Sequence, residues 1–145
     1  MRKYSSVDIL KKIFRDKVKI LCMEHAAAYH GLLEDVEFPM EFYYSIYEDF
    51  CFDTDSLKKG YYIPREHNLS FTDAIYITKT VGVTTIEQTI CDMIVDEKQL
   101  NSICSAIVAY YNRNGMDVSS LIAKAGVEGV GPRLKDILED ILHID

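Results

Sequence analysis

Apolar residues recur at helical spacing through the C-terminal half of the chain, and this periodicity restricts the fold more than any other feature. After Asp96, one continuous apolar stripe predicts an amphipathic helix, which we expect to pack across a sheet. The stripe consists of Leu100, Ile103, Cys104, Ile107, Val108 and Tyr111.

A second helix is expected from near Asp117 to Gly126, and a third has Pro132 in its first turn. The third would bury Leu134, Ile137, Leu138, Ile141 and Leu142. Between these two helices, residues 126–131 are expected to be the most flexible stretch of the chain.

The first half of the chain has the opposite character, because aromatic and β-branched residues gather in short runs that favour strands. These runs cover residues 42–47, 61–63 and 74–78. Before them we expect a helix over about 6–15, a strand around 18–20, and a helix over about 23–30 that stops at Gly31. The sequence thus predicts an α/β (α+β) fold, with a small mixed sheet packed by helices and a helical C-terminal half. Without repeats or linkers, residues 1–145 are expected to form one domain.

Thr84 lies three residues before Glu87, which is the spacing of a helix capping box. The helix that it opens would bury Ile86, Ile90 and Met93 or Ile94.

Charge and cysteine usage narrow the functional classes. Sixteen Lys and Arg against 23 Asp and Glu give a net charge of −7, which on average repels phosphate backbones. Basic residues cluster only near the start, at Arg2, Lys3, Lys11, Lys12, Arg15, Lys17 and Lys19, as on a solvated helix face. The four cysteines, Cys22, Cys51, Cys91 and Cys104, are widely spaced and read as free thiols. No signal peptide or membrane span is predicted, so we expect a cytoplasmic protein without a membrane partner.

Familiar catalytic motifs are absent from the sequence: there is no phosphate-binding loop, dinucleotide fingerprint, HExxH or GxSxG. The Glu24-His25 pair would diverge around a helix, and His30 lies five residues from His25, which is not zinc-helix spacing. Glu87 and Asp92 are also five apart, and Cys91 has no histidine near it in sequence. We therefore predict no enzyme activity, no cofactor and no metal.

Tyrosines are concentrated in the predicted strands, where alternate positions face opposite sides. Exposed tyrosines suit a partner surface, while an aromatic core is the equally weighted alternative. The candidate partner-binding residues are Tyr43, Tyr44, Tyr47, Tyr61 and Tyr62.

Two segments resemble the signatures of the AbiEi family of abortive-infection antitoxins and regulators. Residues 20–32 are similar to a strand-helix signature in which small residues precede a hydrophobic or aromatic position and then His-Gly-Leu. Residues 81–92 resemble a strand ending in Val-Thr, followed by Glu-Arg-Thr and a hydrophobic pair before Asp.

Gln88 stands where arginine is usual, so any ion pair or phosphate contact of that arginine is expected to be missing. The signature positions expected to maintain the fold are His30, Gly31, Thr84, Glu87, Thr89 and Asp92. The resemblance extends from about Val18 to the end, because the later helices fit the family in length and order.

The resemblance implies a non-enzymatic antitoxin or regulator that opposes a nucleotidyltransferase-type toxin in a prokaryotic or phage defence system. Family members commonly carry a winged helix-turn-helix domain in front, whereas only one short helix is expected here before the first signature. Promoter binding is therefore not expected, and the expected partner is a toxin or another host or phage protein. Two alternatives stay open. One is an acidic inhibitor of a host nucleic-acid-binding or defence enzyme. The other is a small metal-dependent nuclease or transferase that uses Glu24, Glu87 and Asp92.

Overall fold

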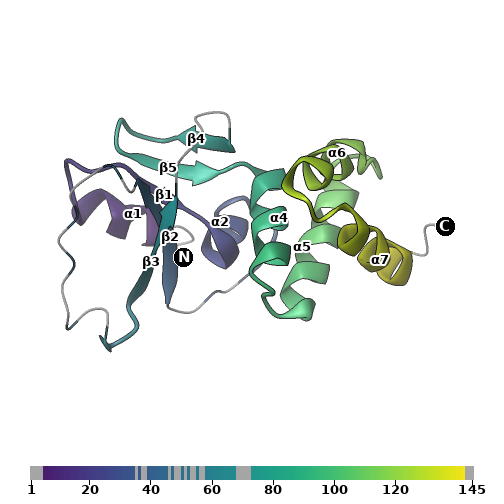
Figure 1. Ribbon diagram of the computed structural model, residues 1–145, viewed down its shortest axis with the longest axis horizontal. Helices are drawn as coiled ribbons and strands as arrows, with labels where there is room; N and C mark the ends of the chain where they lie inside the picture. Colours follow the sequence, from purple (N-terminus) through teal and green to yellow (C-terminus); the bar gives the residue numbers. More distant parts are fainter. Residues whose placement is uncertain are drawn as a thin grey trace.

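The computed structural model describes residues 5–34, 36, 39–45, 47, 50, 52, 55, 58–67 and 73–142. Within them, a five-stranded mixed sheet is combined with helices that dominate the C-terminal half (Figure 1). The predicted α/β class is therefore confirmed.

The strands are β1 (Lys19–Leu21), β2 (Met40–Ser45), β3 (Tyr62–His67), β4 (Ala74–Tyr76) and β5 (Val81–Thr84). The helices are α1 (Ser5–Lys12), α2 (Met23–Tyr29), α4 (Ile86–Val95), α5 (Leu100–Arg113), α6 (Ser119–Glu128) and α7 (Gly131–Leu142). As expected, α2 stops just before Gly31, whose φ of 78° lies in the left-handed region. Ile46, inside the run expected as a strand, lies outside the described residues.

The sheet has the strand order β3-β2-β1-β5-β4. β1 runs parallel to β5 and antiparallel to β2, while β2 and β3 are parallel. The two central strands β1 and β5 are buried along their whole length, as expected for strands covered on both faces. β4, antiparallel to β5, closes one edge.

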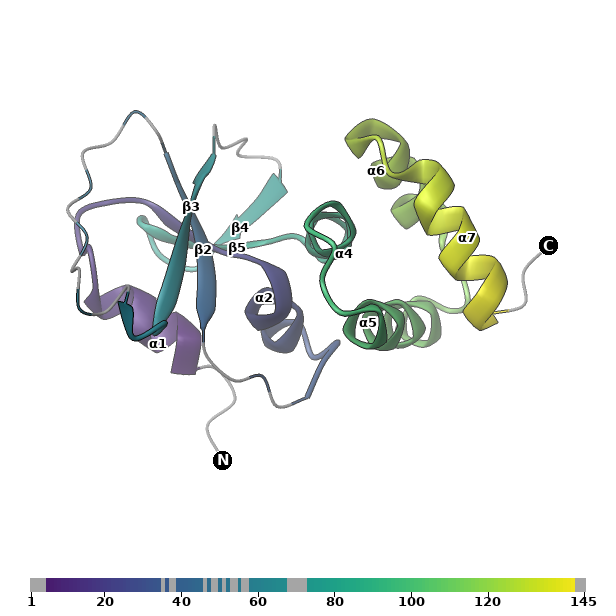
Figure 2. The same cartoon turned by 60° about the horizontal axis from the view of Figure 1, so that its bottom comes forward.

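Helices cover both faces of this sheet (Figures 1 and 2). On one face α1 buries Val7 and Leu10 in a cluster with Leu21, Phe42 and Val83. On the other face α2 and α4 cover Ile20 and Tyr43, which join a second and larger cluster that also includes residues of the C-terminal helices. Alternation along β1 explains the division, because Ile20 and Leu21 point to opposite faces.

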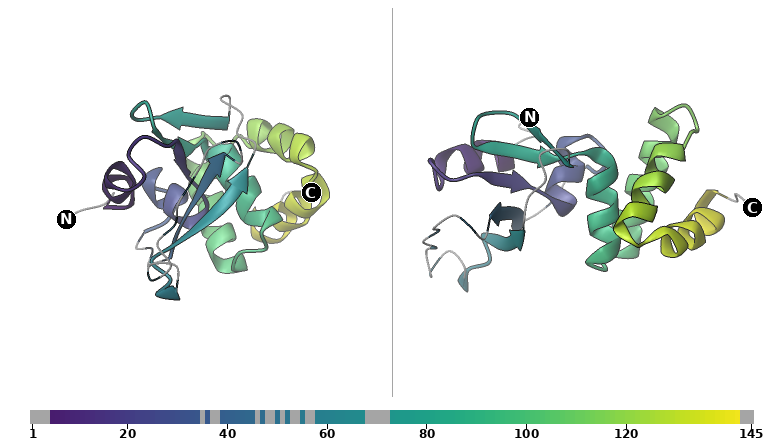
Figure 3. Two further views of the ribbon diagram at one scale, coloured as in Figure 1. Left: turned by 60° about the vertical axis from the view of Figure 1, so that its left-hand side comes forward. Right: turned by 45° about the horizontal axis from the view of Figure 1, so that its top comes forward.

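The C-terminal helices build on α4 rather than on the sheet. α5 packs against α4 and α7, and α6 packs against α4 and α7, so they form a further layer (Figures 2 and 3). The prediction that the helix after Asp96 crosses the sheet was wrong, because α2 and α4 already occupy that face. The buried face of α5 also differs from the predicted apolar stripe, because Leu100 and Val108 of that stripe are exposed. The buried residues of α5 are Ile103, Ala106, Ile107 and Tyr110.

The connection between α6 and α7 is short, so residues 126–131 do not form the loop that was expected between the two helices. Gly126 lies inside α6, and Gly129 ends the helix with a φ of 80°. The Val130 amide then donates to the Ala125 carbonyl oxygen at 2.9 Å. This is the hydrogen bond of a Schellman motif, in which glycine supplies the left-handed residue. The glycines thus form a structured helix end.

The expected basic face near the N-terminus is only partly present. Lys11, Lys12 and Arg15 are exposed, but Lys19 lies in β1, is fully buried, and donates from Nζ to the Phe14 carbonyl oxygen at 2.8 Å. Arg2 and Lys3 lie outside the described residues. In the described part of the chain, every helix is too short or too polar to cross a bilayer.

Candidate functional site

The first turn of α4 is capped by Thr85, not by Thr84. The Thr85 hydroxyl accepts a hydrogen bond from the Gln88 amide nitrogen at 3.3 Å, as an N-cap residue does. Thr84 is the last residue of β5, paired with Ala74, so its backbone is committed to the sheet. The expected N-cap was therefore displaced by one residue, because both threonines lie three residues before a Glu or Gln. The reciprocal bond of a capping box is not made, since the Thr85 amide donates to the Asp73 carbonyl oxygen instead.

Thr84 and Glu87 make other contacts. The Thr84 hydroxyl pairs with the Thr89 hydroxyl at 2.6 Å, inside the protein. Glu87 Oε2 accepts a hydrogen bond from the Tyr110 hydroxyl at 2.9 Å, which ties α4 to α5. These signature residues hold adjoining elements together.

His30 joins the two signature segments. Its Nε2 donates to the Thr84 carbonyl oxygen at 2.7 Å, across 54 positions of sequence. Burial lowers the pKa of His30 from 6.5, and this favours the neutral ring. The Arg113 guanidinium donates to the carbonyl oxygens of His30 and of Gly31, the latter at 3.1 Å. Thus β5, α5 and the end of α2 meet at one junction.

Gln88 occupies the position where the resemblance leads one to expect arginine. Its Nε2 donates to Asp92 Oδ1 at 2.7 Å and to Glu128 Oε1 at 2.9 Å, so one amide bridges two carboxylates. Burial raises the pKa of Asp92 to about 6, although the Gln88 amide and the Tyr43 hydroxyl act in the opposite direction. Asp92 Oδ2 is buried without a partner of hydrogen-bond geometry among the described residues. The Gln88 amide thus donates to both carboxylates but supplies no positive charge.

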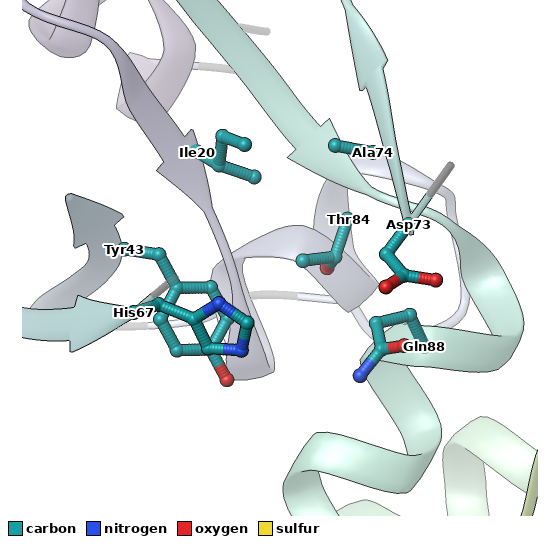
Figure 4. Close-up of a pocket in the computed structure, with 7 residues that line it drawn as sticks. All are labelled: Ile20, Tyr43, His67, Asp73, Ala74, Thr84 and Gln88. Atoms are coloured by element: carbon teal, nitrogen blue, oxygen red, sulfur yellow. The ribbon is translucent and has the colours of Figure 1, made fainter. Parts of the chain in front are cut away.

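A small cavity opens beside Gln88. It is lined by Ile20, Tyr43, His67, Asp73, Ala74, Thr84 and Gln88 (Figure 4). The rings of Tyr43 and His67 lie 4.6 Å apart between centroids, and Figure 4 shows them across the cavity from Asp73 and Gln88. Sequence reasoning missed His67, Asp73 and Glu128, because no local pattern marks side chains that converge only through the fold.

Ion pairs form a second polar group at the other end of α4. Glu41, almost fully buried in β2, is bound by Arg65 at 2.8 Å and by Lys98. Asp96 is bound by the same two cations, and Glu24 lies 3.7 Å from Lys98 Nζ. Glu24 therefore belongs to this network rather than to a site with Glu87 or Asp92. In the described part of the chain, no three His, Cys, Asp or Glu side chains are grouped to hold a metal ion.

Among the remaining reactive residues, His25, Cys22 and Cys91 are buried. His25 Nδ1 pairs with the Ser6 hydroxyl at 2.5 Å, inside the interface of α1 and α2. Burial raises the pKa of the Cys22 thiol, and that of Cys91 to about 12, so both thiols are protonated at neutral pH. Cys104 is a free, half-buried thiol, and Cys51 lies outside the described residues.

The five tyrosines considered for partner binding do not share one environment. Tyr43 and Tyr62 are buried, and half-buried Tyr44 donates to Glu66 at 3.2 Å. Tyr47 and Tyr61 are exposed, at 77% and 51%. Only these last two offer most of their ring to a partner.

No protein-family model and no curated protein matches the sequence.

Proposed function

We propose that this chain is a non-enzymatic, AbiEi-like antitoxin or regulatory protein that opposes a nucleotidyltransferase-type toxin in a prokaryotic or phage defence system. One observation supports the proposal most: the two segments that resemble the AbiEi signatures meet through the hydrogen bond from His30 Nε2 to the Thr84 carbonyl oxygen. Because His30 and Thr84 are 54 residues apart, their proximity in the chain does not explain this contact. Their meeting favours a shared fold over a chance similarity of short motifs.

The contacts of the signature residues support a binding protein rather than an enzyme. Glu87 is engaged by Tyr110, Thr89 by Thr84, and Asp92 by Gln88. A general base must reach the proton that it removes, and a catalytic group needs further convergent groups around it. Residues engaged in this way hold the fold and leave recognition to the surface.

The contacts that we assign to the toxin include Tyr47 and Tyr61, which lie just beyond opposite ends of the paired strands β2 and β3. Tyrosine contributes large contact area at a low cost in side-chain entropy, and both rings are largely exposed. The net charge of −7 favours a partner with a basic surface through long-range attraction.

Co-expression tests the proposal directly. We expect the chain to relieve the growth arrest caused by a nucleotidyltransferase-type toxin encoded beside it. Replacing both Tyr47 and Tyr61 by Ala should weaken the relief, whereas Val127→Ala, which removes a side chain that is 78% exposed on α6, should not. Soluble, folded chain that leaves growth arrest unchanged would contradict the antitoxin function. Inhibition of a host nuclease by the purified chain would instead support the acidic inhibitor.

A further inference from the structure

The cavity beside Gln88 has room for one small group. Its water-accessible volume is about 20 Å³, enough for about one water-sized group. It opens on the face of the sheet that α4 covers, and the Gln88 side chain reaches from α4 toward it (Figure 4). The cavity can therefore hold one small polar group of a ligand. This site does not depend on the toxin partner proposed above.

Two lining side chains carry buried polar atoms that have no hydrogen-bond partner among the described residues. Gln88 is 5% exposed, and its Nε2 already donates to two carboxylates, which fixes the orientation of the amide. Its Oε1 is therefore the free acceptor, and it has no partner among the described residues. His67 Nδ1 is likewise buried without a partner among the described residues, and it accepts a hydrogen bond in the tautomer whose proton is on Nε2. Buried acceptors without donors cost free energy, so a donor arriving from outside would be bound.

The same region has an excess of negative charge. Asp73 lines the cavity, and Gln88 Nε2 binds Asp92 and Glu128 directly behind it. Lys124 pairs with Asp73 at 2.6 Å and lies 3.9 Å from Glu128. Arg65, on β3, is already paired with Glu41 and Asp96. The Lys124 ammonium thus pairs with Asp73 and lies near Glu128, while the third carboxylate, Asp92, is bound by the neutral Gln88 amide.

We infer that this cavity binds the head of a protonated primary amine. An ammonium group is water-sized, carries three N–H donors and no acceptor, and brings the missing positive charge. A divalent cation fits less well, because Mg²⁺ and Ca²⁺ need six or more oxygen ligands. The amine comes either from a small free amine or from a lysine side chain of a partner.

The test is a titration of the isotope-labelled chain followed by NMR. Methylammonium probes the free amine, and N-acetyl-lysine methylamide probes a partner side chain. Tetramethylammonium at equal ionic strength is the control, because it has the charge but no N–H donor. We expect saturable shifts at the Gln88 side-chain amide and at His67, with a Kd on the order of 10 mM for methylammonium, since so small a ligand offers few contacts. Tighter binding of the lysine compound would identify the partner side chain as the source, and equal or weaker binding would identify the free amine.

Matched variants locate the site. Asp73→Asn removes the lining charge but keeps the shape, and we expect it to weaken binding about tenfold. Asp136→Asn makes the same chemical change on the exposed side of α7 and should leave binding unaltered. Absence of saturable shifts in the wild-type chain, or identical shifts with tetramethylammonium, would overturn the inference without reference to any variant. Equal weakening by both variants would overturn it as well.

Discussion

The buried carboxyl group of Asp92 makes the stability of the fold depend on pH. Its pKa is raised to about 6 by burial, so the folded chain holds a proton that the unfolded chain releases near 3.8. Its surroundings are Gln88, Tyr43, Glu128 and His67, which donate hydrogen bonds or add charge. The ionised carboxylate therefore destabilises the fold, and this cost increases as the pH rises from about 4 to about 6.

Asp92→Asn should stabilise the protein above this window. The amide oxygen still accepts from Gln88, and the cost of ionisation is removed. We expect a gain of about 1–3 kcal/mol in the free energy of unfolding at pH 8, shrinking toward zero near pH 4. Urea unfolding at both pH values measures the difference.

Asp117→Asn is the matched control, with the opposite sign. Hydrogen bonds from Ser119 lower the pKa of Asp117, so its carboxylate contributes stability at neutral pH that is lost on acidification. This variant should be less stable than the wild type at pH 8 and indistinguishable from it at low pH. A pH-independent effect of Asp92→Asn would contradict the assignment of a buried, ionising carboxylate.

Gly31 is a second residue whose identity the structure requires. Its φ is 78°, and an added Cβ would lie 2.9 Å from Arg113 Nη2. Gly115 has a similar φ of 65° but nothing within 4 Å of an added Cβ. Both Gly→Ala changes should cost about 1 kcal/mol from backbone strain, and Gly31→Ala about 1 kcal/mol more from the displaced guanidinium.

A double-mutant cycle checks this. In an Arg113→Ala background, the cost of Gly31→Ala should fall to that of Gly115→Ala, as measured by denaturant unfolding. An unchanged cost would mean that Arg113 does not bind this turn.

At the scale of elements, α4 organises the molecule. It packs against α2, α5 and α6, and its N-terminus is fixed by the Thr85 cap. Thr85→Ala should therefore destabilise the fold by about 1 kcal/mol, while Thr85→Ser, which retains the hydroxyl, should cost much less. Thermal unfolding of both variants is the measurement. A neutral Thr85→Ala would contradict the assignment of Thr85 as the N-cap of α4.

At the scale of the whole molecule, charge determines the response to nucleic acid. With a net charge of −7 and Lys19 buried, the exposed basic residues near the start, such as Lys11, Lys12 and Arg15, act against the field of the rest of the surface. We expect no tight duplex binding by this chain at physiological salt. A mobility-shift titration on the region upstream of its own gene, repeated at low salt, measures this. Tight, sequence-dependent binding that is lost when these three residues are replaced would contradict it.

Local sequence patterns were enough to predict most of the elements of this protein and their order. Aromatic and β-branched runs predicted β2, β4 and the start of β3, whereas β5 was expected only from the resemblance of residues 81–92. Apolar periodicity predicted the C-terminal helices, and Gly31 marked the end of α2. These signals are local, because hydrogen-bonding pattern and side-chain direction depend on residues a few positions apart. Thr84 and Thr85 mark their limit, since adjacent threonines fit the same capping pattern and only the pairing of Thr84 with Ala74 in the sheet decided between them.

Only the tertiary structure decided what α5 packs against and which side chains meet. The stripe on α5 was visible in the sequence, but its partner depended on α2 and α4 already covering the sheet. The same holds for the cavity, where His67, Asp73 and Gln88 come from separate elements. Glu128 lies 40 residues from Gln88 and is joined to it by a single hydrogen bond. Contacts at such separations depend on the path of the whole chain, and no spacing within a segment encodes them.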